Sequence, residues 1–184
     1  MKSVYLIAVN TMRELLRNRI LYSILLFAIF LIGLMGALGQ LSHTERVRLT
    51  LGLGLSGIHI SLVLLTLFVG ATLVYREIEK LTILTLLARS IGRTQFLIGK
   101  YLGLLAVILC ITTALFLVFY MNVVLLRFDL NMQDISIAFL GFFLEMMLLL
   151  AVTLFLSTFC ASFLTVTFAL SFFVFGHWIH NLEY

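Results

Sequence analysis

The stretch YLGLLAVILCITTALFLVFYMNVVLL, residues 101–126, decides the fold class of this chain. It contains no charged side chain, and it is longer than the about 20 residues that an α-helix needs to cross a bilayer. Further apolar segments of similar composition cover residues 20–39, 57–75, 135–157 and 159–178. The sequence therefore predicts an all-α, polytopic membrane protein with about five transmembrane helices.

The composition of the whole chain agrees with this class. Of the 184 residues, 63% are hydrophobic and 11% are charged, and there is no proline. Soluble domains carry about 25% charged residues, and a transmembrane β-barrel is built from alternating segments of about 10 residues. The charged fraction is too low for a soluble domain, and alternating segments of this kind are not found. We therefore expect a single transmembrane domain over residues 1–184.

Residues 2–18, KSVYLIAVNTMRELLRN, have a different pattern from the spans. Apolar side chains recur at helical spacing on one face, and polar or charged side chains occupy the other face. This pattern is typical of an amphipathic helix that lies at the membrane interface with its basic face toward the headgroups. The apolar set is Val4, Ile7, Ala8, Thr11, Met12, Leu15 and Leu16, and the polar set is Lys2, Asn10, Arg13, Glu14 and Arg17.

Two connections can be predicted from local composition. Gly52, Gly54 and Gly57 precede the second span, and such a glycine cluster indicates a turn or a partly unwound segment. The last two spans are separated by only a residue or two around Thr158, which predicts a tight helical hairpin. An odd number of spans leads us to expect a sixth helix beyond residue 184.

The distribution of basic residues predicts the orientation. With a cytoplasmic N-terminus, nine basic residues lie inside and three lie outside, as the positive-inside rule requires. This distribution also accounts for the net charge of +4 without nucleic-acid binding. The inside set is Lys2, Arg13, Arg17, Arg19, Arg76, Lys80, Arg89, Arg93 and Lys100, and the outside set is Arg46, Arg48 and Arg127.

Residues 76–100 then form a cytoplasmic loop, whose centre is unusual. Its segment LTILTLL, residues 81–87, is mostly apolar on every face and is flanked by charged residues. Seven residues are far too few to cross a bilayer. A short cytoplasmic helix of this composition must bury its side chains, either under its own bundle or in a groove of a partner protein.

The same loop resembles the cytoplasmic loop of ABC-2 type transporter permeases. That family's pattern is approximately R-E-I-E-x-x-T-I-x-x-L-L, then P-I-S-R, then F-x-x-G-K-x-x-G, and this chain has Ser90 in place of the proline. The N-terminal ELLRNRILYSILLFAIFLI and the late LSTFCASFLTVTFALSFFVFGH also resemble family segments. The matching positions in the loop are Arg76, Glu77, Glu79, Thr82, Ile83, Leu86, Leu87, Arg93, Phe96, Gly99, Lys100 and Gly103.

The resemblance implies a non-catalytic permease subunit of an ATP-binding cassette exporter in the prokaryotic inner membrane. It implies that residues 76–93 dock on a separate cytoplasmic ATPase, which binds ATP and magnesium, and that a second permease chain completes a homo- or heterodimer. A periplasmic partner is a further candidate, and a lipid-like or amphipathic substrate would suit the apolar spans. The alternative is a non-transporting scaffold subunit. The residues expected to couple to the ATPase are Arg76, Glu77, Glu79, Thr82, Leu84, Leu87 and Arg93.

No cofactor or metal site is predicted within this chain. The segment GRTQFLIGKY departs from a phosphate-binding loop, because Gly92 and Gly99 are too far apart and Tyr101 follows the lysine. We instead expect a helix to begin near Gly99, with Lys100 extending to the membrane interface. Cys110 and Cys160 lack metal-ligand spacing, and nothing in the sequence assembles a nucleophile with a base.

Glu145 is the intramembrane residue that most needs an explanation. It falls near the middle of the fourth span, where a charge costs about 2.5–3.5 kcal/mol. Either it serves coupling or a substrate path, or it is a protonated partner of a hydrogen bond between helices. His177 and His180 share a helical face, and a metal site with Glu145 is a minor alternative to an interfacial position beside Trp178. We also expect His59 to lie at the membrane interface.

Overall fold

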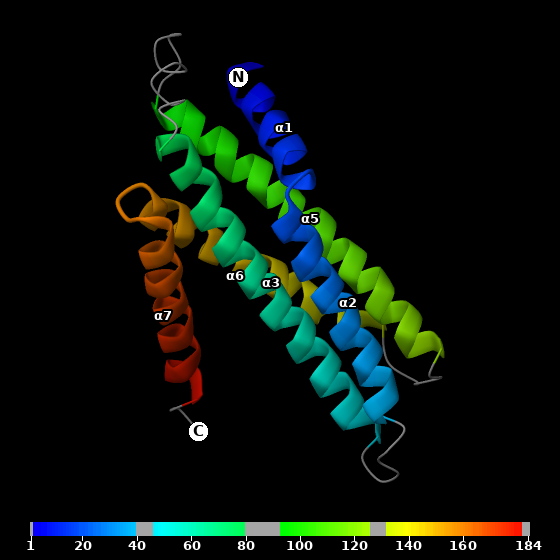
Figure 1. The fold of residues 1–184 in the computed structure, drawn as a ribbon. Helices are drawn as coiled ribbons and strands as arrows, with labels where there is room; N and C mark the ends of the chain where they lie inside the picture. Colours follow the sequence, from blue (N-terminus) through cyan, green and yellow to red (C-terminus); the bar gives the residue numbers. More distant parts are fainter. Residues whose placement is uncertain (1, 40–45, 80–92, 126–131, 182–184) are drawn as a thin grey trace.

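The computed structural model describes residues 2–39, 46–79, 93–125 and 132–181. All regular secondary structure in these residues is helical, which confirms the predicted all-α class (Figure 1). The helices are α1 (Lys2–Leu16), α2 (Arg19–Gly39), α3 (Arg46–Glu79), α5 (Arg93–Leu125), α6 (Met132–Ser157) and α7 (Ser162–Asn181).

Three helices in the described residues are long and apolar enough to cross a membrane. The candidate spans are Leu51–Leu73 of α3, Thr94–Leu125 of α5 and Ile135–Ser157 of α6. A fourth candidate arises only if α1 and α2 are taken together, and these two helices meet at an angle of 63°. The apolar part of α7, Ser162–Trp178, is shorter than the other spans. A membrane-embedded chain is therefore well supported by its helices.

Helix α3 occupies the centre of the bundle (Figure 1). It contacts α2, α5, α6 and α7. In the most apolar 18 residues of the candidate span, 56% are buried in α3, against 28% in α6. Its buried side chains include Leu62, Leu65 and Leu67, which belong to one continuous apolar core shared with α5 and α6. The helices around α3 consequently turn their other faces outward.

The N-terminal half of α3 is continuous helix, so the predicted turn or unwound segment at Gly52–Gly57 is wrong. Packing against α2 explains why at least one of these glycines is compatible with a helix. A Cβ atom at Gly57 would lie 3.2 Å from Leu31 Cβ, so this glycine lets α2 and α3 approach closely. Small residues have the same role at many helix contacts within membranes.

Helix α1 is a separate helix, and Asn18 explains where the chain bends. The Asn18 side-chain oxygen accepts a hydrogen bond of 3.1 Å from the backbone N–H of Ile20, which caps the first turn of α2. The Tyr22 hydroxyl also donates to the Leu16 carbonyl oxygen over 2.7 Å and so ties α2 back to the end of α1. The predicted boundary between an amphipathic segment and the first apolar helix is correct.

The apolar stripe of α1 is covered by α5 rather than left open. Thr11 and Leu15 are buried, whereas Leu16, which was expected on the same face, is 41% exposed. The seam depends on two glycines of α5: a Cβ at Gly99 would lie 2.9 Å from Ile7 Cβ, and a Cβ at Gly103 only 2.7 Å from the Ala8 carbonyl oxygen. This four-residue glycine spacing brings the two backbones close together.

Helix α5 begins at Arg93, not near Gly99 as the sequence predicted. Gly99 was interpreted as a helix start, but it lies inside the helix because α1 packs against it. Lys100 was expected to extend toward the interface, yet it is only 3% exposed, and its Nζ atom lies 5.5 Å from the centre of the Phe96 ring. The lysine is therefore held within the protein beside an aromatic ring.

Helices α6 and α7 form the predicted hairpin, closed by the turn at 158–161. The backbone N–H groups of Thr158 and Phe159 donate to the carbonyl oxygens of Phe155 and Leu156, which ends α6 in a tightened turn. The connection is slightly longer than the one or two residues expected. It places α7 beside both α6 and α3.

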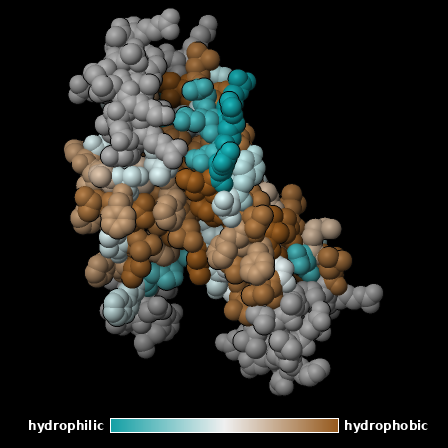
Figure 2. Space-filling view, viewed as in Figure 1, coloured by the Kyte–Doolittle hydropathy of each residue, from teal (hydrophilic) through white to brown (hydrophobic). Residues whose placement is uncertain are grey.

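The face of the molecule shown in Figure 2 is apolar over most of the described helices, and hydrophilic side chains gather on the outward face of α1. Exposed aromatic residues such as Phe163, Phe172 and Phe175 of α7 are at least 63% accessible. A soluble monomer rarely exposes apolar patches of this extent. The outward face of α1 carries Asn10, Arg13 and Glu14, and Arg17 follows directly after the helix, as the amphipathic pattern predicted.

Candidate functional site

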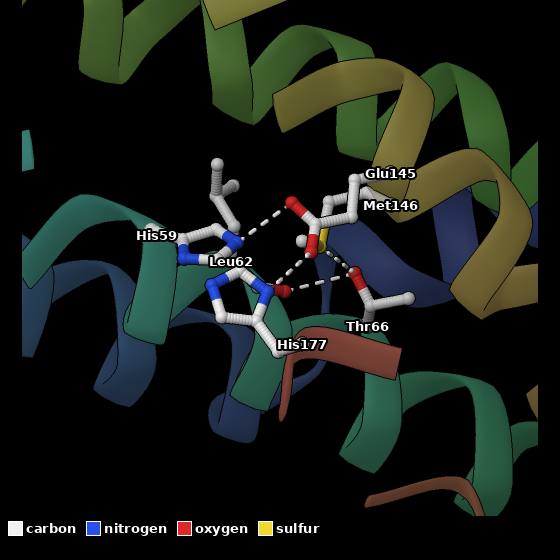
Figure 3. Close-up of polar contacts among 6 residues, drawn as sticks. All are labelled: His59, Leu62, Thr66, Glu145, Met146 and His177. Carbon is white, nitrogen blue, oxygen red and sulfur yellow. Dashed lines mark hydrogen bonds and ion pairs between the residues drawn. The ribbon is translucent and has the colours of Figure 1, made fainter. Parts of the chain in front are cut away.

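A cluster of three ionisable side chains lies where α3, α6 and α7 meet (Figure 3). The Nε2 atom of His59 on α3 lies 2.8 Å from Oε2 of Glu145 on α6. The Nδ1 atom of His177 on α7 lies 4.0 Å from the other carboxylate oxygen, Oε1. Glu145 thus hydrogen-bonds one histidine and faces a second one at a longer distance.

The position of Glu145 follows from the geometry of α6. It lies near the middle of a helix of 26 residues, so at 1.5 Å per residue it is about 20 Å from either end. The next residue, Met146, is fully buried, and its sulfur lies 3.4 Å from the Thr66 hydroxyl on α3. Close packing of Met146 against α3 brings the neighbouring carboxylate within reach of His59.

Aromatic rings hold the two histidines in place. The His59 ring stacks on Phe142, with 4.9 Å between ring centres and 16° between planes. The His177 ring stacks on Phe173 at 5.6 Å, and the two imidazoles lie 5.9 Å apart. These contacts restrict the rings to a few orientations, so the cluster is preorganised by its apolar surroundings.

Accessibility increases from His59 to His177 across the cluster. The side chains of His59, Glu145 and His177 are 16%, 33% and 64% exposed. Glu145 and His177 border a groove of about 230 Å³ between α6 and α7. Its remaining lining is Leu148, Leu149, Phe172, Phe173 and Gly176. The groove therefore has two ionisable side chains, Glu145 and His177, and is otherwise lined by apolar residues and Gly176.

The hydrogen bond determines what the carboxylate can do chemically. In the tautomer with its proton on Nε2, a neutral His59 donates to Oε2, and the negative charge stays on Glu145. The separation of 4.0 Å between Oε1 and His177 exceeds hydrogen-bond length. Oε1 can consequently accept a hydrogen bond from a group that enters the groove.

Sequence reasoning identified Glu145 but did not identify its partner. The His59 ring is packed between helices and bonded to Glu145. Its expected position at the membrane interface stays a prediction. The two residues are separated by 86 positions, and no spacing rule connects them. His177 was grouped with Glu145 only as a metal ligand, together with His180, whose side chain lies outside the described part of the chain. Within that described part, no group of three His, Cys, Asp or Glu side chains could hold a metal ion.

The residues predicted to contact an ATPase are only partly described. Arg76, Glu77 and Glu79 belong to the last turn of α3, and Arg93 is the first residue of α5. Thr82, Leu84 and Leu87 lie outside the described residues, so their predicted docking role remains a prediction. The end of α3 and the start of α5 do lie at the same end of the molecule as the N-terminus (Figure 1).

Replacing Glu145 should show how much the cluster contributes to stability. In Glu145→Leu, the His59 donor loses its partner. We expect the free energy of unfolding to fall by about 0.6–1.7 kcal/mol, the average and the maximum for hydrogen bonds between helices in a membrane protein. Glu145→Gln keeps an acceptor and should retain most of the stability. Thermal unfolding in lipid nanodiscs measures both changes, with the exposed Met147→Leu on the same helix as control. Equal stability of all variants would show that the bond does not join α3 to α6 effectively.

A comparison with protein-family models and a search of curated protein sequences find no match for this chain.

Proposed function

We propose that this chain is the membrane-embedded, non-catalytic permease subunit of an ATP-binding cassette exporter of the ABC-2 type. The observation that carries the proposal is the similarity of residues 76–103 to the cytoplasmic loop of that family. The apolar helices support a membrane location for the chain. ATP and magnesium would bind to a separate cytoplasmic subunit.

The arrangement of helix ends is consistent with a coupling role for residues 76–93. The last turn of α3 and the first turn of α5 lie at one end of the bundle, together with α1 (Figure 1). A force applied to these two ends would reach the central helix α3 directly. It would also reach α1 through the glycine seam with α5, where the two helices are in close contact.

We propose five membrane crossings with a cytoplasmic N-terminus, in the prokaryotic inner membrane. Helices α2 and α7 have 21 and 20 residues, so at 1.5 Å per residue each is about 30 Å long. That length equals the thickness of a typical hydrocarbon core. The distribution of nine basic residues inside and three outside supports the orientation.

The mechanism that we propose is alternating access in a complex of two permease chains and two ATPases. Closure of the ATPase pair on ATP would push the segment 76–93 and rock the helical bundles against each other. Lipid-like or amphipathic cargo is favoured by the apolar surface of α6 and α7. The chain would supply the path, and the ATPase would supply the free energy.

Co-purification tests this proposal directly. An affinity-tagged chain, extracted from its native membrane in mild detergent, should bring down an ATP-binding subunit in stoichiometric amount. ATP hydrolysis by the isolated complex should then depend on the permease. A stable complex without any ATPase would contradict the proposal and favour a scaffold subunit, and covalent chemistry that persists without an ATPase would favour an enzyme.

A further inference from the structure

The groove between α6 and α7 combines a fixed carboxylate with apolar walls. Glu145 stands at its side, and Leu148, Leu149, Phe172 and Phe173 contribute the apolar surface. Binding sites for small molecules are commonly concave and mostly apolar, with a few polar groups that orient the ligand. This groove has that composition, and among the described residues that line it Glu145 is the acidic one.

An exposed carboxylate at this depth is costly if only lipid covers it. Glu145 is 33% exposed and lies near the middle of α6, where an unpaired charge is strongly disfavoured. His59 hydrogen-bonds Oε2, whereas His177 lies 4.0 Å from Oε1, within ion-pair distance but beyond hydrogen-bond length. A cation that donates a hydrogen bond to Oε1 would complete the site, and charge-assisted bonds of this kind are among the strongest in proteins.

We propose that this groove binds a cationic amphiphile, namely an alkyl amine whose ammonium group contacts Glu145 Oε1 and whose tail lies against the walls of α6 and α7. The charge of the carboxylate selects an amine over an alcohol or a fatty acid with the same tail. The walls formed by Leu148, Leu149, Phe172 and Phe173 accept tails of different structure, because these four side chains offer no hydrogen bond to discriminate among them. The inference rests on the proposed function only where it makes this ligand a transport substrate.

Binding can be measured on the full chain without an ATPase. We would reconstitute the chain in nanodiscs of zwitterionic lipid and measure saturable binding of tritiated octylamine by scintillation proximity, with empty nanodiscs as background. Unlabelled octan-1-ol and octanoate serve as competitors with the same tail. We expect octylamine to bind about ten- to a hundredfold more tightly than octan-1-ol, the ratio that one charge-assisted bond provides, and octanoate not to compete.

Two pairs of variants separate the head and tail contributions. Glu145→Gln keeps an acceptor for His59 but removes the charge, so it should abolish the preference for the amine, whereas Glu14→Gln on the exposed face of α1 should keep it. A side chain at Gly176 would enter open space in the groove, so Gly176→Leu should weaken both octylamine and octan-1-ol. Gly141→Leu, also in open space but outside the groove, should weaken neither.

Several results would overturn the proposal. Equal affinity for octylamine and octan-1-ol in the unmodified chain would do so, as would an amine preference that survives Glu145→Gln, or unchanged binding of both compounds by Gly176→Leu. Saturable binding of zinc that requires Glu145, without amine binding, would make the cluster a metal site instead. A chain that forms a stable dimer in the nanodisc and binds no amine would show that a second copy covers the groove. Failure of an ATPase to co-purify would contradict the transport function but leave the amine site itself intact.

Discussion

Replacing Gly103 with leucine should separate α1 from α5. A Cβ atom at this position would lie 2.7 Å from the Ala8 carbonyl oxygen and 2.9 Å from Thr11 Cβ. The carbonyl belongs to the backbone of α1 and cannot rotate away as a flexible side chain would. The whole helix must therefore move, and overpacking of this kind costs about 1–3 kcal/mol. We expect a clear fall in melting temperature in nanodiscs.

Gly141→Leu is the matched control for Gly103→Leu. It introduces the same side chain within a helix, but nothing lies within 4 Å of its Cβ position. Leucine has a higher helix propensity than glycine, so local propensity favours the substitution at both sites. The control should therefore melt at or slightly above the temperature of the unmodified chain. If both variants melt alike, α1 does not depend on close contact with α5.

Placing a carboxylate in the segment 81–87 should release the ATPase. If this segment occupies a groove of a partner, Leu84→Asp and Leu87→Asp each bury an unpaired charge where an apolar side chain was. Such a change costs several kcal/mol, because the charge cannot be solvated inside the groove. Since docking energy is concentrated in a few buried residues, a loss of that size should dissociate the complex. A pull-down in mild detergent, with ATP hydrolysis assayed alongside, measures the result.

The control for these variants is Asn10→Asp. Asn10 is exposed on α1, so this variant adds the same charge without burying it. Lys100 is unsuitable as a neutral control, because it is buried beside Phe96 and its replacement would disturb packing. The permease itself should insert normally in every variant. A stoichiometric, normally stimulated ATPase on both aspartate variants would favour a scaffold role for the chain.

The fold was predictable where hydrophobicity alone determines structure. The apolar runs 20–39 and 135–157 closely match α2 and α6, because every face of these helices avoids water. Prediction failed where a contact between helices decides the outcome. Gly52, Gly54 and Gly57 indicated a turn or unwound segment, yet α3 continues through them. Gly57 packs against Leu31 of α2. A single sequence shows that a glycine is present, but not which helix approaches it.

The candidate site was predictable only in part, for a similar reason. Glu145 was conspicuous because a carboxylate within an apolar run is expensive. Its contact with His59 joins residues on α3 and α6, and no periodicity within either helix indicates that pairing. The amphipathic stripe of α1 was likewise clear from the sequence, but its contact with α5 was not. The sequence pattern indicated only a helix at the membrane interface. Patterns within one helix are local, whereas both contacts are tertiary.

Photo-crosslinking from position 84 tests the coupling claim most directly. A photoreactive amino acid in place of Leu84 would be activated in intact membranes that contain the native partners. The account predicts a covalent product between this chain and an ATP-binding subunit, and no such product from Gln133, an exposed residue at the start of α6. Crosslinks from position 84 that never include an ATPase, or an ATPase captured only from position 133, would contradict it.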